Sequence, residues 1–467
     1  MCVEHLERTM IKIKNKKVKI TLMALGIILL IGAILTVIIV PLYFTNVSFS
    51  DPAEGFELPI VTLDEIGGGD ALRFEVDRTD SYQAHPDMTI VDDGKARIVY
   101  TQGHGKGPLT MRELDFANEQ IEVSQRIENT PASWESSQET GTLYTLQFVD
   151  GEGDKTDKSV VILVSGCPHW PGTTIRKNGF NCSISTDKGN NWTEFQNFYG
   201  RQWAKKNRNK AAFDCIVAMS SLTQLKENGK FVNKWMGTFH DHKFVNYKTY
   251  LTFEESANGG LEMRWTEPVP LLGQWRSTEK KTGMCEIEIL RTPSSDGAAN
   301  GGDTLVLIAR SEKRVSGSMI AFSDDEGESW SCPKSLPLEL SGDRHKAAYD
   351  EESGKLIISF RHINPFAKRY SNLGAQKTTA SLGWIGWVGS FDDLLSYRQD
   401  DSSKHTKGDM VLLFSRGYKN GGDCGYSGTA VVNGNFIGVS YGTFDEYAQE
   451  PYILGVKIPI ANILSKL

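Results

Sequence analysis

Residues 284–330 read MCEIEILRTPSSDGAANGGDTLVLIARSEKRVSGSMIAFSDDEGESW, and this stretch decides the fold. Three runs rich in Ile, Leu and Val, at 287–290, 304–309 and 318–322, are separated by loops of Ser, Asp, Gly and Asn. Short apolar runs between turn-forming residues are typical of antiparallel β-strands. With a fourth strand expected after Trp330, the stretch predicts one small four-stranded sheet.

Such a sheet cannot bury its apolar faces alone, and the same pattern recurs about six times along the chain. The repeats begin near His85, Glu139, Ile216, Glu286, Arg344 and Tyr426. Six four-stranded units arranged around an axis form a β-propeller, which leaves only short sheet edges. The sequence therefore predicts an all-β, six-bladed β-propeller over residues 76–467.

Two repeats close with the pattern Ser-x-Asp-x-Gly-x-x-Trp, at residues 185–192 and 323–330. In a turn between the third and fourth strands, Asp accepts backbone N–H groups, Gly supplies a positive φ and Trp fills the gap between blades. This motif is the Asp box, and on it the chain resembles the sialidase (neuraminidase) superfamily. The resemblance implies the propeller fold; the motif itself is structural and also occurs in propellers that are not enzymes.

The amino-terminal segment predicts a membrane anchor. Residues 20–44, ITLMALGIILLIGAILTVIIVPLYF, carry no charge and are long enough to cross a bilayer as a tilted helix. Five lysines between residues 12 and 19 favour a cytoplasmic amino end, and a cleaved signal peptide is the alternative. We predict a cytoplasmic tail at 1–19, a transmembrane signal anchor at 20–44, and a stalk with a first strand at 45–75. The chain is then a single-pass type II membrane protein with a lumenal or extracellular propeller.

Composition and cysteine usage agree with that location. The chain has 467 residues and a net charge of −7, which argues against nucleic acid as a partner. An even number of cysteines follows the predicted span, which indicates disulfide bonds whose pairing stays open: Cys167, Cys182, Cys215, Cys285, Cys332 and Cys424. Asn46, Asn181 and Asn191 begin glycosylation acceptor sequences, so the protein is expected to be a glycoprotein.

Polar residues gather where the first strand of each repeat starts and the second strand ends. In a propeller blade these two points lie on the same face, so their side chains converge at the mouth of the central channel. The strand starts supply His85, Asp87, Glu139, Glu286, Arg344, His345 and Tyr426, and the strand ends supply Gln102, His104, His240, Asp241, His242, Arg310, Arg361 and Asp445. Arginines, acids and a tyrosine in one funnel predict a binding or catalytic site.

This set of residue types has a chemical logic. Arginine forks bind a carboxylate in a bidentate manner. A substrate with a carboxylate beside its reacting carbon would repel an Asp or Glu nucleophile, whereas a neutral tyrosine that loses its proton to a nearby Glu avoids that repulsion. The combination is that of a retaining glycosidase acting on sialic acids.

The resemblance to the sialidases implies roles for single residues. Tyr426, in Cys-Gly-Tyr-Ser, matches the nucleophile, and Glu286, in Cys-Glu-Ile, matches its paired base. Arg310, in Ala-Arg-Ser, matches a carboxylate-binding arginine. Arg361 is the favoured second arginine because it occupies the same blade position as Arg310. Arg344 and Arg369 are the alternatives.

The chain departs from the sialidase pattern at two positions. The family opens its first blade with Arg-Ile-Pro, where this chain has Ala-His-Pro, so Arg344 is expected to take the role of that arginine with His85 assisting. The family places its acid/base aspartate in a loop that here reads GHGKGPL, without an acid. Asp241 is the substitute candidate. Its neighbours His240 and His242 also allow a metal-site hypothesis, which we do not favour because a third ligand is lacking.

The sequence thus predicts a membrane-anchored exo-α-sialidase, a glycoside hydrolase that releases terminal sialic acids with a tyrosine nucleophile. One alternative is a related glycosidase or transferase acting on another acidic sugar. The other is a non-catalytic propeller that binds sugars or proteins. The expected partners are a sialylated glycan and a membrane; no metal and no cofactor are predicted, and the oligomeric state stays open.

Overall fold

A computed structural model of the chain describes residues 58–467, apart from residues 104–106, 118–120, 137–138, 169–177, 208–209, 258, 294–302, 365–380 and 418–422. The described residues fall within one compact unit, Phe56–Leu467. The predicted tail, transmembrane segment and first part of the stalk lie outside them, so these assignments stay predictions. Within the described part of the chain, no helix combines the length and the apolar character needed to cross a bilayer.

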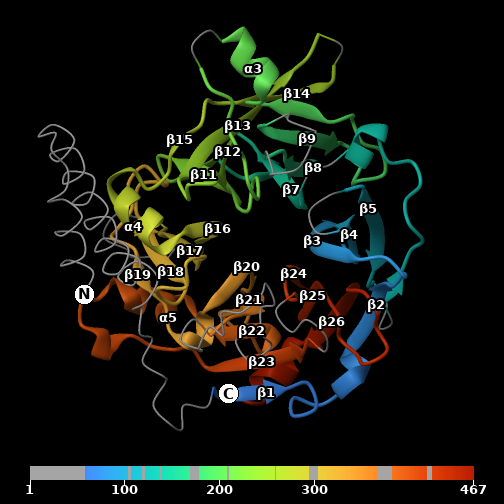
Figure 1. The fold of residues 1–467 in the computed structure, drawn as a ribbon, viewed down its shortest axis with the longest axis vertical. Coiled ribbons are helices and arrows are strands. Elements are labelled where there is room, and N and C mark those ends of the chain that lie inside the picture. Colours follow the sequence, from blue (N-terminus) through green and yellow to red (C-terminus); the bar gives the residue numbers. More distant parts are fainter. Residues whose placement is uncertain are drawn as a thin grey trace, which may run out of the picture. The chain divides into compact units, whose positions relative to one another are not determined.

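Six antiparallel sheets surround a common axis, as predicted (Figure 1). Blade 1 consists of β3 (Gln83–Asp92), β4 (Lys95–Gln102), β5 (Leu109–Asp115) and β6 (Glu122–Val123); blade 2 of β7 (Gly141–Val149), β8 (Lys155–Gly166), β9 (Phe180–Ser185) and β10 (Gln196–Phe198). Blade 3 consists of β11 (Leu222–Glu227), β12 (Lys230–His240), β13 (Asn246–Glu255), β14 (Leu261–Trp265) and β15 (Val269–Pro270); blade 4 of β16 (Met284–Arg291), β17 (Leu305–Ser311), β18 (Met319–Ser323) and β19 (Lys334–Ser335). Blade 5 consists of β20 (Gly342–Asp350), β21 (Lys355–His362), β22 (Gly383–Gly389) and β23 (Met410–Ser415); blade 6 of β24 (Ser427–Val432), β25 (Asn435–Gly442) and β26 (Tyr452–Pro459).

Two strands from the amino-terminal side of the unit complete the last two blades. The strand β2 (Arg73–Asp77) pairs antiparallel with β26 and supplies the fourth strand of blade 6. The strand β1 (Ile60–Thr62) pairs parallel with β23 at the edge of blade 5. Part of the segment expected to form the stalk therefore belongs to the propeller, and the ring is closed by pairing residues from both ends of the unit.

Short helices occupy some of the connections: α3 (Arg201–Lys206), α4 (Arg276–Thr282), α5 (Phe391–Leu395) and α6 (Ile460–Leu464). The helix α4 matters for the site because it leads directly into β16. It ends at Gly283, whose φ of 71° is the left-handed conformation that commonly terminates a helix. Its buried Glu279 accepts hydrogen bonds from the backbone and side-chain nitrogens of Asn246 in blade 3. The start of β16 is thus held against the neighbouring blade.

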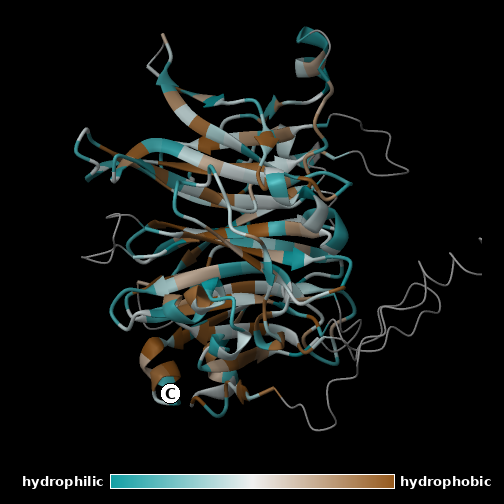
Figure 2. Cartoon of the chain, turned by 90° about the vertical axis from the view of Figure 1, so that its left-hand side faces the viewer, coloured by the Kyte–Doolittle hydropathy of each residue, from teal (hydrophilic) through white to brown (hydrophobic). Residues whose placement is uncertain are grey.

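The core lies within and between the blades, where apolar side chains of adjacent sheets pack face to face. Hydrophobic segments run along the strands, whereas the connecting loops are largely hydrophilic (Figure 2). Trp330 lies between β18 and β19 of blade 4 and packs in one cluster with Met236 of blade 3. The rings of Trp192 and Trp134 meet edge to face, with centroids 5.3 Å apart. Tryptophans therefore fill the space between neighbouring sheets.

The two Ser-x-Asp-x-Gly-x-x-Trp turns have the same hydrogen-bond pattern. The serine hydroxyl accepts the N–H of the motif glycine at 2.8 Å from Gly189 and 2.9 Å from Gly327. It donates to the motif aspartate at 2.7 Å in the first turn and 2.8 Å in the second. Both glycines have a positive φ, 81° and 82°. Each turn leads from the third strand of its blade to the fourth, at the opposite end from the strand starts.

The six cysteines of the described residues form no disulfide bond with one another, so the predicted disulfides are wrong. All but Cys332 are buried. Cys182 and Cys215, for example, pack in the apolar cluster of blades 2 and 3, where a thiol behaves as a small hydrophobic group. An even number of cysteines in a sequence does not show that any two of them lie close enough in the fold to form a disulfide bond. Asn181 is likewise buried within β9, which excludes it as a glycosylation acceptor.

Candidate active site

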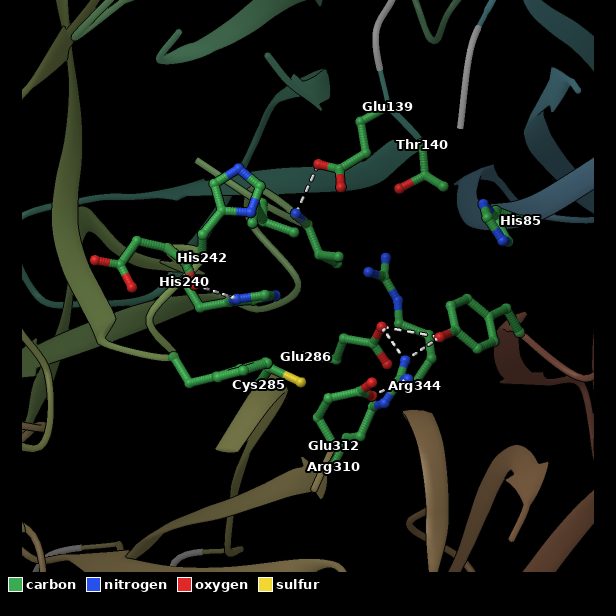
Figure 3. Close-up of a pocket in the computed structure, with 15 residues that line it drawn as sticks. His85, Glu139, Thr140, His240, His242, Cys285, Glu286, Arg310, Glu312 and Arg344 are labelled. Carbon is green, nitrogen blue, oxygen red and sulfur yellow. Dashed lines mark hydrogen bonds and ion pairs between the residues drawn. The ribbon is translucent and has the colours of Figure 1, made fainter. Parts of the chain in front are cut away.

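All six blades contribute to one pocket of about 440 Å³ at an end of the propeller axis (Figure 3). Its lining comes from the starts of first strands and the ends of second strands, where the sequence predicted a funnel. The lining residues are His85, Glu139, Thr140, Ile216, Val217, His240, Asp241, His242, Phe244, Cys285, Glu286, Arg310, Glu312, Arg344 and Tyr426. Seven residues were predicted from the sequence to have a catalytic or binding role, and six of them line the pocket: His85, Asp241, Glu286, Arg310, Arg344 and Tyr426. The exception is Arg361.

Three of these side chains come from residues with the same unusual backbone conformation, a positive φ. His85, Glu286 and Arg344 have φ values of 51°, 50° and 53°, which non-glycine residues rarely adopt. Each lies where its strand shifts register against the second strand of the blade. A β-bulge of this kind redirects a side chain that regular pairing would send elsewhere, and bulges occur often beside functional sites. The fold therefore presents residues of blades 1, 4 and 5 in equivalent ways.

Tyr426 approaches the pocket with the help of a glycine. Gly425 precedes it with a φ of 91°, and a Cβ atom there would lie 2.8 Å from the Cα atom of Arg361. Any larger residue would clash with that backbone. The guanidinium carbon of Arg361 consequently lies 4.8 Å from the centroid of the Tyr426 ring. Arg361 thus packs over the face of the Tyr426 ring.

Tyr426, Glu286 and Arg310 form a closed triangle of hydrogen bonds. The Tyr426 hydroxyl donates to Glu286 Oε1 at 2.9 Å. Arg310 Nη1 donates to the same carboxylate oxygen at 2.7 Å and to the phenol oxygen at 2.5 Å. Tyr426 is 116 positions from Arg310 and 140 positions from Glu286 in the chain. The juxtaposition predicted for Tyr426 and Glu286 is therefore present.

The electrostatic environment keeps the phenol protonated. Burial raises the pKa of Tyr426 well above its ordinary value, and the Glu286 carboxylate adds to that effect, while Arg310 and Arg361 oppose it. The proton stays on the oxygen and points to Glu286. Tyr426 can become a nucleophile when Glu286 takes this proton as a new bond to the phenol oxygen forms.

Asp343, for which the sequence predicted no role, pairs with three arginines at once. It is fully buried, and its carboxylate contacts Arg314 Nη1 at 2.5 Å, Arg361 Nη2 at 2.6 Å and Arg310 Nε at 3.1 Å. Burial alone would raise the pKa of Asp343, but the three guanidinium groups outweigh it and hold the pKa below its ordinary value. The sequence feature that could have indicated Asp343 as a site residue is its position next to Arg344.

Arg344 differs in its contacts from the other arginines of the site. Arg310 also pairs with Glu286 and Glu312. The guanidinium groups of Arg310, Arg314 and Arg361 thus face three carboxyl groups, those of Asp343, Glu286 and Glu312. Among the described residues, no hydrogen bond or ion pair reaches the guanidinium group of Arg344, which lines the pocket (Figure 3). Arg344 therefore presents a positive charge to a pocket that also contains the carboxyl groups of Glu139 and Asp241.

His85 and Asp241 both line the pocket, but their contacts suit supporting roles. The His85 ring stacks on the Tyr426 ring with centroids 5.0 Å apart and meets the Tyr441 ring edge to face at 4.9 Å. It therefore orients the tyrosine. Asp241 Oδ1 accepts the backbone N–H groups of Lys243 at 2.8 Å and Val245 at 2.9 Å. The carboxylate predicted to act as the acid holds the turn after β12.

Blade 2 supplies two polar residues to which sequence analysis gave no role. Glu139 is 5% exposed and accepts the backbone N–H of Val217 at 2.6 Å. Burial raises the pKa of Glu139 to about 8. The neighbouring Thr140 hydroxyl and Glu286 Oε2 are buried polar atoms without a hydrogen-bond partner among the described residues. Buried polar atoms are normally satisfied, so these two atoms indicate where polar groups of a ligand would bind.

The two histidines beside Asp241 face different partners. His240 Nδ1 lies 3.1 Å from the backbone oxygen of Asp241, and its ring stacks on Phe244. His242 Nε2 lies 2.8 Å from Asp214 Oδ2. Within the part of the chain that the structure describes, no group of three or more His, Cys, Asp or Glu side chains is placed to hold a metal ion.

No protein-family model matches the chain, and no curated protein sequence matches it significantly. Among solved structures, a protein of unknown function from Dyadobacter fermentans is similar, with 13% identity, 83% of this chain and 98% of that chain covered, and a TM-score of 0.52. The intramolecular trans-sialidase from Ruminococcus gnavus, in complex with oseltamivir carboxylate, has 10% identity, coverage of 84% and 98%, and a TM-score of 0.46. An α-L-arabinanase from Penicillium chrysogenum, complexed with arabinobiose, has 9% identity, the same coverage and a TM-score of 0.47. The likeness to the Dyadobacter fermentans protein supports the fold, and the chemistry of the pocket has to carry any argument on function.

Proposed function

We propose that this chain is a retaining exo-α-sialidase that removes terminal sialic acid from glycoconjugates. The observation that carries the proposal is the hydrogen bond from the Tyr426 hydroxyl to Glu286, with Arg310 donating to both oxygens. A buried phenol paired with a carboxylate at the mouth of a propeller has the parts of an activated nucleophile.

The charge of the pocket favours a substrate with one carboxylate. Arg344 offers a guanidinium fork that is not paired with a described residue, and such a fork binds carboxylates in a bidentate manner. A carboxylate attached to the reacting carbon would repel an acidic nucleophile, which explains why a neutral phenol occupies that position. The Thr140 hydroxyl and Glu286 Oε2 are available for the hydroxyl groups of the sugar.

The reaction proceeds in two displacements at the anomeric carbon. The Tyr426 oxygen forms a bond to this carbon as the bond to the leaving oxygen breaks; Glu286 takes the phenol proton, and an acid in the pocket protonates the leaving oxygen. Water then attacks the tyrosyl intermediate from the opposite side, and the phenol regains its proton from Glu286. Two inversions give net retention. Arg310 stabilises the charge that develops on the phenol oxygen in both steps.

A fluorogenic sialoside assay of the full chain tests the proposal, together with nuclear magnetic resonance of the first anomer released. We expect turnover with the α-anomer of the sugar appearing first. Turnover of uronosyl or other ulosonyl substrates alone would instead point to a related glycosidase. Tight sugar binding without turnover, unaffected by Tyr426→Phe, would identify a binding propeller and contradict the proposal.

Arg344 is expected to be the main determinant of carboxylate recognition. The variant Arg344→Met should lower kcat/KM on a sialoside by about 10² to 10³-fold, because removing a preorganised donor for a substrate anion has effects of this size. Arg344→Lys should recover part of the loss, since it restores the charge but not the fork. The check is the ratio of kcat/KM for the sialoside and its carboxyl-reduced analogue. If Arg344→Met leaves this ratio unchanged, Arg344 does not bind the carboxylate.

We further propose that residues 20–44 anchor the propeller to a membrane, a proposal supported by the uncharged sequence and the preceding lysines. The full chain should stay in the membrane pellet after alkaline carbonate washing and dissolve with detergent. A chain lacking residues 1–44 should be released without detergent. Release of the full chain by carbonate would exclude an integral anchor.

A further inference from the structure

We infer that Glu139 is the acid that protonates the leaving oxygen and then serves as the base for the attacking water. This inference rests on the proposed function. It assigns to Glu139 the acid/base role for which Asp241 was the candidate from the sequence. It concerns one carboxyl group on blade 2, across the pocket from the nucleophile.

The position of Glu139 suits the second carboxyl of a retaining mechanism. The nucleophile and its base come from blades 6 and 4, so a proton donor has to reach the glycosidic oxygen from another direction. Glu139 belongs to the segment that enters blade 2, and Figure 3 shows its carboxyl group across the pocket from that of Glu286. A sugar ring held between the two would expose its leaving oxygen to Glu139 while Tyr426 attacks from the other side.

The other acidic groups in or beside the pocket have different tasks. Asp241 holds a turn through two backbone N–H groups. Glu312 pairs with Arg310, and Asp214 pairs with His242. His240 is not a suitable donor, because burial lowers its pKa to about 4 and leaves the imidazole neutral at the pH of most cells. Glu139 also lines the pocket and is the carboxyl group that we assign to proton transfer.

The surroundings of Glu139 keep its proton in place at neutral pH. The side chain is 5% exposed, and burial raises its pKa to about 8; the charged groups that face it are Arg344, which lowers this pKa, and Glu286 and Asp214, which raise it. The amide of Val217 donates to Oε2 at 2.6 Å, which lowers this pKa without cancelling the larger effect of burial. A carboxyl with a raised pKa donates a proton at neutral pH, which is the state a general acid requires.

The fold also makes room for this carboxyl group. Gly166 ends β8 directly beside it, and a Cβ atom on Gly166 would lie 2.1 Å from Glu139 Oε2 and 2.6 Å from the backbone oxygen of Cys215. A glycine is therefore required where the carboxyl group packs. Close packing on one side and the pocket on the other hold the acid in a defined position.

The proton balance is complete within the two steps. In the first step the Glu139 proton moves to the leaving oxygen as its bond to the anomeric carbon breaks, and Glu139 becomes a carboxylate. In the second step that carboxylate takes a proton from the attacking water while the tyrosyl bond breaks. Glu139 returns to its protonated form, and no further reactant is needed.

The test compares two sialosides that differ in leaving group. On a sialyl disaccharide, whose alcohol needs a proton to leave, Glu139→Gln of the full chain should lower kcat/KM by about 10² to 10⁴-fold. On an aryl sialoside with a strongly acidic phenol, the loss should stay under about tenfold, because the phenolate leaves without a proton. The decline of wild-type activity above about pH 8 should disappear in the variant. Asp241→Asn is measured in parallel, as is Glu279→Gln, a buried carboxyl change outside the pocket.

The outcomes separate the inference from the function on which it rests. Equal losses on both substrates in Glu139→Gln, or a dependence on leaving group in Asp241→Asn instead, would overturn the role of Glu139 while leaving the sialidase intact. Absence of any wild-type turnover would overturn both.

An independent readout is thermal unfolding from pH 5 to 8. A carboxyl whose pKa is higher in the folded than in the unfolded chain loses its stabilising effect as pH rises. The wild type should therefore lose stability relative to Glu139→Gln over this range, and parallel curves would contradict a protonated Glu139.

Discussion

Tyr426→Phe is expected to lower kcat on an activated sialoside by at least about 10³-fold, because removing a nucleophile forfeits the covalent pathway. The phenyl ring keeps its stacking on His85 and its contact with Arg361, so the fold should survive. KM should change much less than kcat, since the lost atom acts on the anomeric carbon and not on the carboxylate. Steady-state kinetics with purified variant and wild type provide the measurement.

A matched control separates chemistry from packing. Tyr100 of blade 1 is also fully buried, and its hydroxyl donates to Asp77 at the end of β2 in blade 6, outside the residues that line the pocket. Tyr100→Phe removes a comparable hydrogen bond and should leave kcat within about threefold of the wild type, because its effect is on stability of order 1 kcal/mol. If Tyr426→Phe behaves like Tyr100→Phe, the proposed nucleophile is wrong.

The second large effect is expected at Asp343. Asp343→Asn keeps the shape of the side chain but leaves three largely buried guanidinium groups facing one fewer negative charge. Breaking a buried ion pair from one side costs about 3 to 5 kcal/mol, so the free energy of unfolding should fall by about that amount. Because Arg310 and Arg361 also position Tyr426, kcat should fall together with stability. Urea denaturation followed by fluorescence measures the first, and sialoside kinetics the second.

Glu312 offers the comparison, since its carboxyl also pairs with Arg310 but is 40% exposed. Glu312→Gln should cost less than about 1 kcal/mol, because exposed ion pairs contribute little. Adding Arg314→Met to Asp343→Asn removes one of the unpaired charges and should restore part of the stability. An unfolding midpoint of Asp343→Asn equal to that of the wild type would show that the carboxylate does not hold the arginines together.

Some of the contacts between site residues could be predicted from the sequence, and others could not. The strand start at Glu286 and the strand end at Arg310 lie opposite each other at the pore end of blade 4, with Cys285 and Arg310 as register partners. Tyr426 lies at the equivalent point of blade 6. Counting strands predicted that these positions share one face, and the resemblance to the sialidases implied the pairing of Tyr426 with Glu286. The preference for Arg361 as a carboxylate ligand could not be tested by counting, since both Arg361 and Arg344 stand at plausible positions.

Local sequence patterns were enough to predict six blades and the face on which polar residues converge. These features depend on local periodicity and turn chemistry, which short stretches carry independently of the rest of the chain. The three-dimensional arrangement was needed to see that Asp343 pairs with Arg310, Arg314 and Arg361, and that Glu139 is buried beside the pocket. Ion pairing and desolvation depend on distances between groups from different blades, and no local pattern encodes those distances.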